Sequence, residues 1–453
     1  MSDPRRIAVG ADVGSTYTKA FLVDLDTGSL LGAAEHSTTL SSDVLRGFDA
    51  ASRTAAGALT VPYEIVRTDL CSSAGGGLRL AVVGYERLVT AEAGQKVGLS
   101  AGARVVHVAA GPLDGAGVQA LRSDRPDVIL LVGGTDGGDA DVLRHNAHRL
   151  AAARLRVPVV VAGNRDARGD ALAALAGRGV AATATANVLP RIGVLEPGPA
   201  RAAIREVFLS HVIGGKGLSR GPRFASLVRG PTPDVVLTAV ELLAAEIGGD
   251  LLVVDVGGAT TDVYSVLEPD PEGPARPWDT GVAGALWHSR TVEGDLGVRE
   301  GAAGVVAAAG AERLLGPAEA DDLTGPADRR AADPSYLPTT DSDQRAEARL
   351  AMLAALVAVR RHARGRDLRR VRALIGSGGV LRHARDPEAI LAPVLTDTAG
   401  GWALPTKATV AIDRQYRLAP AGLLATVARG ETGVAQAEEV ARRVLAPLVP
   451  AES

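Results

Sequence analysis

Short apolar runs alternate with turn-forming residues from the start of the chain. Residues 7–13, 20–25 and 29–34 have the apolar spacing that predicts three strands joined by turns, and a helical pattern follows at 42–58. Four pairs of a strand-like and a helical run come next: 78–83 with 90–100, 105–109 with 114–121, 128–132 with 140–153, and 157–162 with 168–176. This alternation predicts a parallel sheet covered by helices.

A similar succession of predicted strands and helices begins again in the second half of the chain. The Pro- and Gly-rich stretch 221–234 predicts a boundary between two lobes. The elements predicted beyond it are a helix at 235–247, strands at 251–255 and 261–267, a loop at 316–343, and helices at 344–364 and 432–448. We therefore predict a first domain at 1–230 and a second domain at 231–453.

Composition narrows the class of protein. Of the 453 residues, 46% are apolar and 22% are charged, which allows a sizeable core, and a net charge of −3 gives no broad basic field for nucleic acid or anionic lipid. The apolar runs are too short to span a bilayer, and the first residues do not resemble a signal peptide. The single cysteine, Cys71, excludes an internal disulfide and fits a reducing compartment. These features predict a cytoplasmic protein that binds neither membranes nor nucleic acid.

A strand, a glycine turn and a second strand occur once near the start of each half. The first copy reads DVGSTYTK from Asp12 to Lys19, and the second reads DVGGATTD from Asp255 to Asp262. A turn rich in Gly, Ser and Thr can direct several backbone N–H groups at one anion, such as a phosphate. A lone copy is more consistent with an ordinary hairpin, but two copies at matching places favour phosphate binding.

The chemistry expected of each copy follows from its residue types. Asp12 and Asp255 would hold a hydrated Mg²⁺ next to the phosphates, and Lys19 would add a positive charge. The other predicted phosphate-binding residues are Gly14, Ser15, Thr16, Gly257, Gly258, Thr260 and Thr261. Together the two hairpins are expected to clamp the phosphates of one nucleotide between the lobes.

A third glycine turn lies in the stretch VRALIGSGGVLRHA, at 371–384. It follows a predicted strand and precedes a predicted helix, so that Gly376, Gly378 and Gly379 would let a base and ribose lie on the backbone. Alone, this turn is an ordinary strand-to-helix connection. As the third motif in order, it indicates an adenosine site.

These three motifs resemble those of the actin, sugar kinase and heat-shock chaperone ATPase superfamily. The first has the spacing of actin's first phosphate loop, the second resembles the second phosphate loop of DnaK-type chaperones, and the third resembles the adenosine motif. The resemblance implies an α/β, two-lobed, actin-like ATPase fold with duplicated ribonuclease-H-like domains. The additional strand–helix pairs then predict an α/β insertion in the first lobe. ATP or ADP and Mg²⁺ are the implied ligands.

A closer resemblance covers nearly the whole chain. The stretches CSSAGGGLRL, VGGTDGG, VDVGGATTDVYS and RTVEGDLGVR, together with the motifs above, are similar to the accessory protein of glutamate mutase, the MutL or GlmL type. The resemblance implies a weak ATPase that assists or reactivates an adenosylcobalamin-dependent mutase, with the mutase subunits as partners. The chain contains no D-x-H-x-x-G stretch, so no cobalamin binding through a histidine ligand is expected.

Other functions of the same fold stay open at this stage. Asp136 follows a predicted parallel strand and is a candidate catalytic base or an acceptor for water around Mg²⁺, whereas an ordinary turn is the alternative. With such a base, a small-molecule kinase is the main alternative function. A filament-forming protein is a third alternative that no sequence feature favours. Catalysis by Cys71 is not favoured, because no neighbouring histidine is evident.

Overall fold

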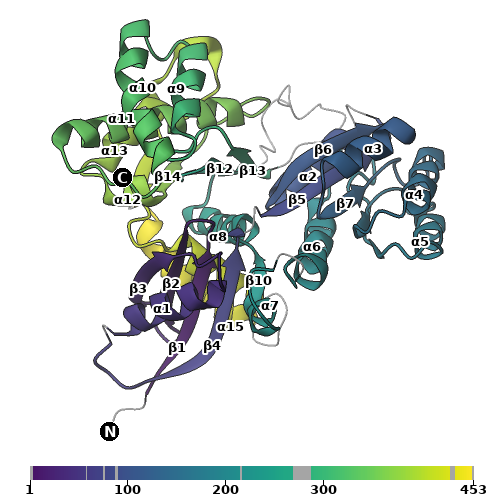
Figure 1. Ribbon diagram of the computed structural model, residues 1–453, viewed down its shortest axis with the longest axis horizontal. Helices are drawn as coiled ribbons and strands as arrows, with labels where there is room; N and C mark the ends of the chain where they lie inside the picture. The colour runs from purple at the N-terminus through teal and green to yellow at the C-terminus, as the bar shows by residue number, and fades with distance from the viewer. Residues whose placement is uncertain are drawn as a thin grey trace. The chain divides into compact units, whose positions relative to one another are not determined.

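The computed structural model describes residues 4–57, 59–74, 77–86, 90–214, 217–268, 287–428 and 434–450 (Figure 1). These residues form two compact units. The first unit takes the described residues up to Leu237 and those of 422–440. The second takes those of 238–268, 287–421 and 441–450. The division into a first domain at 1–230 and a second domain at 231–453 stays a prediction.

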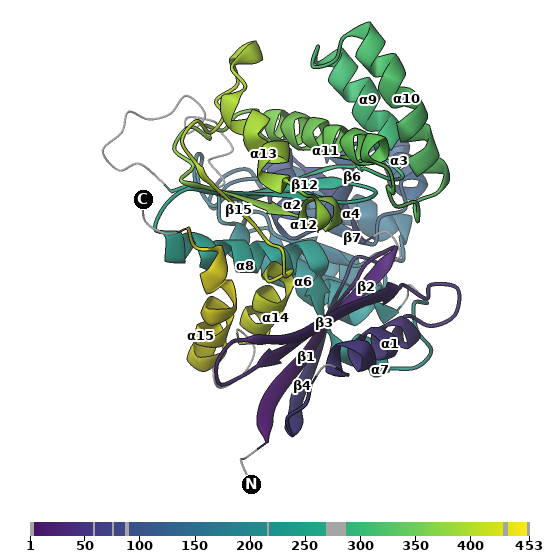
Figure 2. The same cartoon turned by 90° about the vertical axis from the view of Figure 1, so that its left-hand side faces the viewer.

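The first unit contains a mixed five-stranded sheet with the order β10-β4-β1-β2-β3. Its strands are β1 (Arg5–Val13), β2 (Tyr17–Asp24), β3 (Leu30–Ser37), β4 (Tyr63–Ser72) and β10 (Val228–Pro231). The first three strands pair antiparallel, whereas β4 lies parallel to both β1 and β10. Helix α1 (Val44–Ala56) begins where the Asp43 side chain accepts from the backbone N–H of Leu45, and its apolar side packs on this sheet (Figure 2).

The second unit contains a sheet with the corresponding order, β13-β12-β11-β14-β15. Its strands are β11 (Leu251–Val256), β12 (Thr261–Val266), β13 (His288–Glu293), β14 (Ala373–Ser377) and β15 (Thr409–Ile412). Again the first three strands in sequence pair antiparallel, and the last two are parallel additions. Both sheets therefore have the strand order 3-2-1-4-5 with strand 2 reversed. This confirms the prediction of duplicated ribonuclease-H-like domains.

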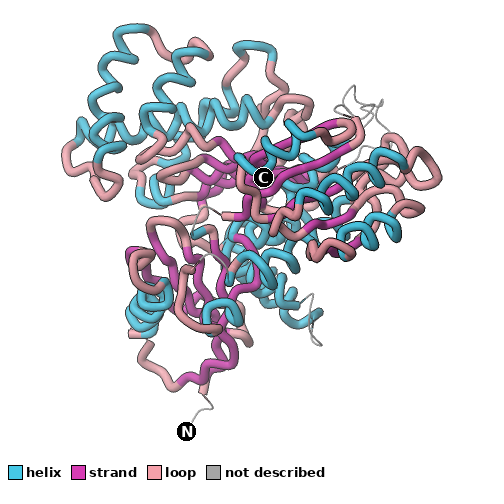
Figure 3. Tube along the Cα trace, turned by 45° about the vertical axis from the view of Figure 1, so that its right-hand side comes forward, coloured by secondary structure: helices cyan, strands magenta, loops and turns pink. Residues whose placement is uncertain are grey.

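A third, fully parallel sheet lies within the first unit, between β4 and β10 in the sequence. Its order is β6-β5-β7-β8-β9, and its strands are β5 (Leu78–Gly84), β6 (Ala103–Ala110), β7 (Val128–Leu131), β8 (Val159–Val161) and β9 (Ala182–Ala184). The helices that accompany it are α2 (Glu92–Ser100), α3 (Gly115–Ser123), α4 (Asp141–Ala153) and α5 (Arg168–Ala176) (Figure 3). The predicted α/β insertion is confirmed.

The remaining helices connect or cover these sheets. In the first unit they are α6 (Pro197–Val207), the π-helix η3 (Phe208–Val212) and α7 (Arg223–Leu227). Helix α8 (Thr232–Ile247) starts in the first unit and continues in the second. The later helices are α9 (Ala302–Ala311), α10 (Pro317–Ala332), α11 (Asp341–His362), α12 (Gly379–His383), α13 (Pro387–Thr396), α14 (Leu418–Ala428) and α15 (Val434–Leu445), with short 3₁₀ turns at Ala399–Gly401 and Ala446–Leu448.

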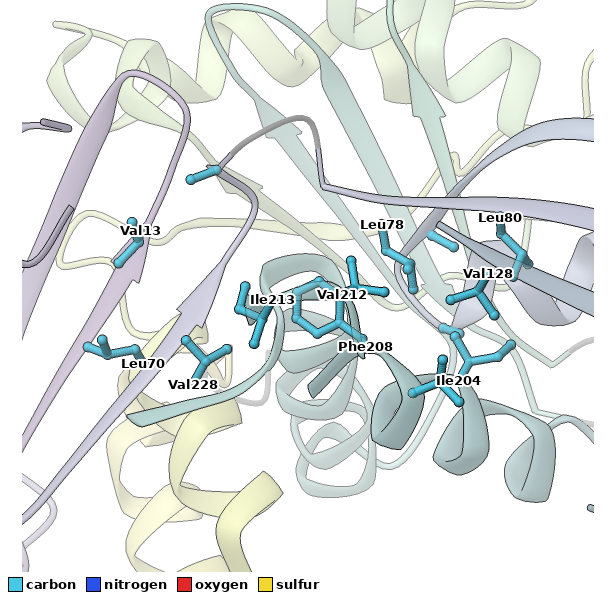
Figure 4. Packing of buried hydrophobic residues seen from close by; sticks show 14 of the residues in the cluster. Val13, Leu70, Leu78, Leu80, Val128, Ile204, Phe208, Val212, Ile213 and Val228 are labelled. Carbon is cyan, nitrogen blue, oxygen red and sulfur yellow. The ribbon is translucent and has the colours of Figure 1, made fainter. Parts of the chain in front are cut away.

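Each unit has a large apolar cluster, and the first unit has a second cluster on the inserted sheet and its helices. In the first unit, Phe208, Val212 and Ile213 are buried between residues of the mixed sheet and residues of the inserted sheet (Figure 4). The surrounding side chains labelled there are Val13, Leu70, Leu78, Leu80, Val128, Ile204 and Val228. In the second unit, α11 supplies a large share of the core and lies with α13 on one face of the sheet (Figure 2). Ala, Val and Leu fill both cores, as the scarcity of aromatic residues requires.

One expectation about local structure was wrong, and one strand of the first sheet was missed. The segment expected as a loop at 316–343 contains the 16-residue helix α10, because buried Leu323 and Ala327 anchor it to α9 and α11. Its first proline occupies the first turn, where no N–H is needed, and the Arg330 side chain donates to the carbonyl of Pro326 inside the helix (2.9 Å). Strand β4 was not predicted, because its first half carries charged residues and exposed apolar ones.

None of the helices in the described part of the chain has both the length and the apolar character needed to cross a membrane.

Candidate functional site

The first glycine turn closes the β1–β2 hairpin. The Gly14 backbone N–H donates to the Tyr17 carbonyl (3.1 Å), and a Cβ at Gly14 would lie only 2.8 Å from that oxygen. Glycine is therefore required for this turn. Below the turn, Asp12 is paired directly with Lys19 across the two strands. Opposed residues of an antiparallel pair share one face of the sheet, so this carboxylate and ammonium are neighbours.

The Asp12 carboxylate is buried and held from two sides. The Thr232 hydroxyl donates to its Oδ1 (2.6 Å), and the Cys71 thiol lies 3.8 Å from the same oxygen. Burial and the nearby Asp12 charge raise the pKa of Cys71 well above its ordinary value, so the thiol stays protonated and acts as a donor. This geometry assigns Cys71 to the support of Asp12 and gives it no nucleophilic character.

The second glycine turn has the same geometry in the second unit. The Gly257 N–H donates to the Thr260 carbonyl (2.9 Å), and a Cβ at Gly257 would again lie 2.8 Å from that oxygen. Asp255 occupies the position of Asp12, two residues before the glycine, and its cross-strand partner is Asp262. The two hairpins are therefore equivalent in backbone structure and differ in charge, with a lysine in the first and an aspartate in the second.

Asp262 already has a cationic partner in the structure. Arg290 on β13 binds its Oδ1 through Nη2 (2.5 Å) and Nε (2.8 Å), and the guanidinium lies 5.9 Å from the centre of the Tyr264 ring. The Thr260 hydroxyl also donates to Asp262 (3.1 Å). An aspartate neutralised in this way has a structural role, and it leaves Asp255 as the candidate metal carboxylate of this hairpin.

The third glycine turn lies against the second hairpin. Strand β14 is parallel to β11 and pairs Ser377 with Asp255, and the Ser377 hydroxyl donates to Asp255 Oδ2 (3.4 Å). Gly378 has φ +99° and ψ 157°, and a Cβ there would lie 2.2 Å from the Val256 carbonyl. Only glycine fits this position, and the turn brings the predicted adenosine motif into contact with the strand that carries Asp255.

The segment after β13 covers the other side of the second hairpin. The backbone N–H groups of Val298 and Arg299 donate to the carbonyls of Gly257 and Gly258 (3.0 and 2.8 Å). The Arg299 side chain binds Glu347 of α11 (2.7 Å). Glu347 in turn binds Arg330 of α10 (3.3 Å), whose side chain is fully buried. A network of ion pairs thus connects the glycine turn to two helices of the core.

The predicted phosphate-binding residues do not all present a side chain to a ligand. Ser15 and Thr16 are exposed at the tip of the first turn. Thr261 is buried, and its hydroxyl donates to the Leu296 carbonyl (2.6 Å), so its contribution is to fix the hairpin. Gly376 is also buried, facing apolar side chains of α13 and β15. In the first hairpin Asp12 lies next to the turn at Gly14, and in the second hairpin Asp255 lies next to the turn at Gly257.

Asp136 belongs to the inserted sheet, in the loop after β7. Its Oδ1 accepts from the Arg165 backbone N–H (3.0 Å) and from Nδ2 of the buried Asn187 (2.9 Å). These bonds tie together the loops after β7, β8 and β9. The two hydrogen bonds give Asp136 a structural role in holding these loops. A catalytic role for Asp136 stays a prediction.

Two glycines of the second unit, one in the third turn and one outside the site, allow a matched test of this turn. Gly378→Ala is expected to weaken adenine nucleotide binding at least tenfold, because alanine at this φ and ψ costs on the order of 1–3 kcal/mol before the clash with Val256 is counted. Gly310→Ala in α9 is the control, since a Cβ there meets no atom within 4 Å and Gly310 belongs to none of the glycine turns. Calorimetric titration with ADP measures both. Equal affinity of the two variants would contradict the proposed role of this turn.

Several residues of the site were not predicted from the sequence. The contacts not predicted are those of Thr232, Cys71 and Ser377 with the two aspartates, and the ion pair of Glu347 with Arg299 beside the second turn. The strand pairing could have indicated Cys71 and Ser377, because each is paired with an aspartate of the neighbouring parallel strand. Among the described residues, no group of three or more His, Cys, Asp or Glu side chains is arranged to bind a metal ion directly.

Comparison with known proteins shows to which family the chain belongs. The model of the MutL protein family matches residues 8–437. The chain belongs to this family. It is also 35% identical, over 446 residues, to Protein MutL of Clostridium tetanomorphum, covering 91% of this chain and 95% of that relative. The predicted resemblance to the MutL type is thereby confirmed.

Several solved structures resemble this member of the MutL family, with much lower sequence identity than the relative above. A nucleotide-free acetone carboxylase is 14% identical with a TM-score of 0.41, covering 93% of this chain and 70% of that chain. The ethanolamine utilization protein EutJ of Carboxydothermus hydrogenoformans is 12% identical with a TM-score of 0.31, covering 93% and 90%. The xylulose kinase of Bifidobacterium adolescentis is 13% identical with a TM-score of 0.31, covering 98% and 93%. These scores are too low to support a functional conclusion.

Proposed function

We propose that the chain binds ATP with Mg²⁺ and hydrolyses it slowly, as an accessory or reactivating protein of an adenosylcobalamin-dependent mutase. The observation that supports ATP binding best is the pair of equivalent hairpins. Each places a buried or half-buried aspartate two residues before a glycine turn that requires glycine at 14 or 257. Such turns present backbone N–H groups to phosphate oxygens.

The residues of both hairpins fit a hydrated magnesium ion. Mg²⁺ prefers oxygen ligands and keeps several waters, so one carboxylate beside phosphate oxygens is a common arrangement. Asp12 offers a carboxylate whose orientation is already fixed by Thr232, and Asp255 offers one fixed by Ser377. When bound, the ion would offset phosphate charge and stabilise charge that develops during hydrolysis. Lys19, next to Asp12, would supply a further positive charge to the same phosphates.

The proposed partner follows from the family resemblance. MutL-type proteins are thought to assist glutamate mutase, and this chain is proposed to serve a mutase of that class. Contacts to the γ-phosphate would favour one conformation of the protein, and hydrolysis would remove them. The partner would respond through a difference in affinity between the two nucleotide states.

Capture of mutase subunits by the immobilised chain tests this partnership. The capture is done without nucleotide, with Mg²⁺–ADP, and with Mg²⁺ and a non-hydrolysable ATP analogue. We expect different amounts of bound subunit in the three states, and no such difference for Asp12→Asn. Identical capture in all three states by the native sequence would contradict a nucleotide-driven accessory role.

A further inference from the structure

A short hydrogen bond to Asp12 comes from a residue 220 positions later in the chain. The Thr232 hydroxyl donates to Asp12 Oδ1 at 2.6 Å. Thr232 is the first residue of α8 and stands between Pro231 and Pro233 in the sequence GPTPD. Because both prolines have a fixed φ, the backbone around this threonine has little freedom.

Strand register explains why Thr232 reaches Asp12. Asp12 on β1 is paired with Cys71 on β4, and Cys71 is paired with Gly230 on β10. The three strands are parallel, so they end at the same edge of the sheet. Thr232 begins the helix just beyond that edge, directly after Pro231, and its side chain reaches the carboxylate across β4.

The first turn of α8 is itself anchored to the inserted part of the first unit. Asp234 is fully buried and binds two arginines of α6, Arg201 (3.3 Å) and Arg205 (2.5 Å). A Cβ added at Gly102, just before β6, would lie 2.7 Å from the Asp234 backbone nitrogen. Close packing and a doubly paired carboxylate therefore fix the position from which Thr232 donates.

We infer that Thr232 is a positioning residue, whose hydroxyl holds the Asp12 carboxylate in the orientation that receives the hydrated magnesium ion of bound ATP. Cys71 gives the same oxygen a weak thiol contact at 3.8 Å, so the hydroxyl is the stronger of these two contacts. The inference rests on the proposed ATP site. It adds a residue outside the glycine motifs, and it connects the first hairpin to α6 through a single helical turn.

The test measures nucleotide binding rather than turnover. Thr232→Val keeps the size of the side chain and removes the donor, whereas Thr232→Ser keeps the hydroxyl. Calorimetric titrations with ADP are done in Mg²⁺ and in EDTA. For Thr232→Val we expect about a tenfold loss of affinity in Mg²⁺, the value of one hydrogen bond to a charged group, and little change in EDTA. Thr232→Ser should bind as the native sequence does.

A double-mutant cycle with Asp12→Asn tests whether Thr232 acts through Asp12. Thr232→Val should have almost no further effect once Asp12 is replaced, since residues that act together are not additive. Thermal unfolding monitors folding of all variants. If Thr232→Val weakens binding equally in Mg²⁺ and EDTA, or adds fully to Asp12→Asn, the positioning role is wrong while the ATP site stands. If the native sequence binds no nucleotide, the proposed function itself fails, and this inference fails with it.

Discussion

Replacing Asp12 by asparagine is expected to lower Mg²⁺-dependent ATP turnover by about 100-fold, since in the proposed site this carboxylate would support a metal ion that contributes several kcal/mol to charge stabilisation. The fold should survive, because the asparagine carbonyl can still accept from Thr232. Asp255→Asn should have a comparable effect through the second hairpin. Steady-state release of phosphate, with Mg²⁺ in excess, measures the loss.

Asp24 offers a matched control within the same hairpin. It is also buried, but it lies at the opposite end, paired with Ile7, and accepts from the N–H groups of Asp26 and Thr27. Asp24→Asn should reduce stability and leave turnover per folded molecule almost unchanged. Equal turnover of Asp12→Asn and the native sequence would show that the proposed metal position is wrong.

The second large effect is expected at Glu347. This nearly buried carboxylate binds Arg299 and the fully buried Arg330 at once. Glu347→Gln removes the charge that compensates both guanidinium groups, and breaking a buried pair in this way costs about 3–5 kcal/mol. Urea unfolding should show this loss, and ADP affinity should fall as well, because Arg299 packs on the Gly258 turn.

Asp341 near the start of the same helix is the matched control. Its ion pair with Arg385 joins two exposed side chains, and such pairs contribute little to stability. Asp341→Asn should therefore change neither the unfolding midpoint nor ADP affinity. If Glu347→Gln behaves like Asp341→Asn in both measurements, the network does not support the second turn.

The two hairpins could be predicted from the sequence because their chemistry is local. Each has a buried strand, a turn that needs glycine within a few residues, and a return strand, so spacing alone places Asp12 near Gly14 and Asp255 near Gly257. The parallel insertion was also predictable, since a strand and its helix follow one another in the chain. The family resemblance then implied the duplicated ribonuclease-H-like domains that both mixed sheets show.

The supporting residues depend on contacts between distant segments, which spacing does not encode. Thr232 is 220 positions from Asp12, and Arg299 is 48 positions from Glu347. The stretch 221–234 predicts a lobe boundary because it is rich in Pro and Gly, and the sequence does not indicate that its last residue, Asp234, is buried and bound to two arginines of α6. The segment that contains α10 predicts a loop because it is rich in Asp and Pro. It is helical because burial of Leu323 and Ala327 outweighs the weak helix propensity of the sequence.

The most direct test of the central claim is calorimetric titration of the native chain with ATP, in Mg²⁺ and in EDTA. Two equivalent glycine hairpins with supporting aspartates predict saturable uptake of one nucleotide per chain, tighter in the presence of the metal. If folded protein takes up no adenine nucleotide in excess Mg²⁺, the hairpins are structural turns and the account is contradicted.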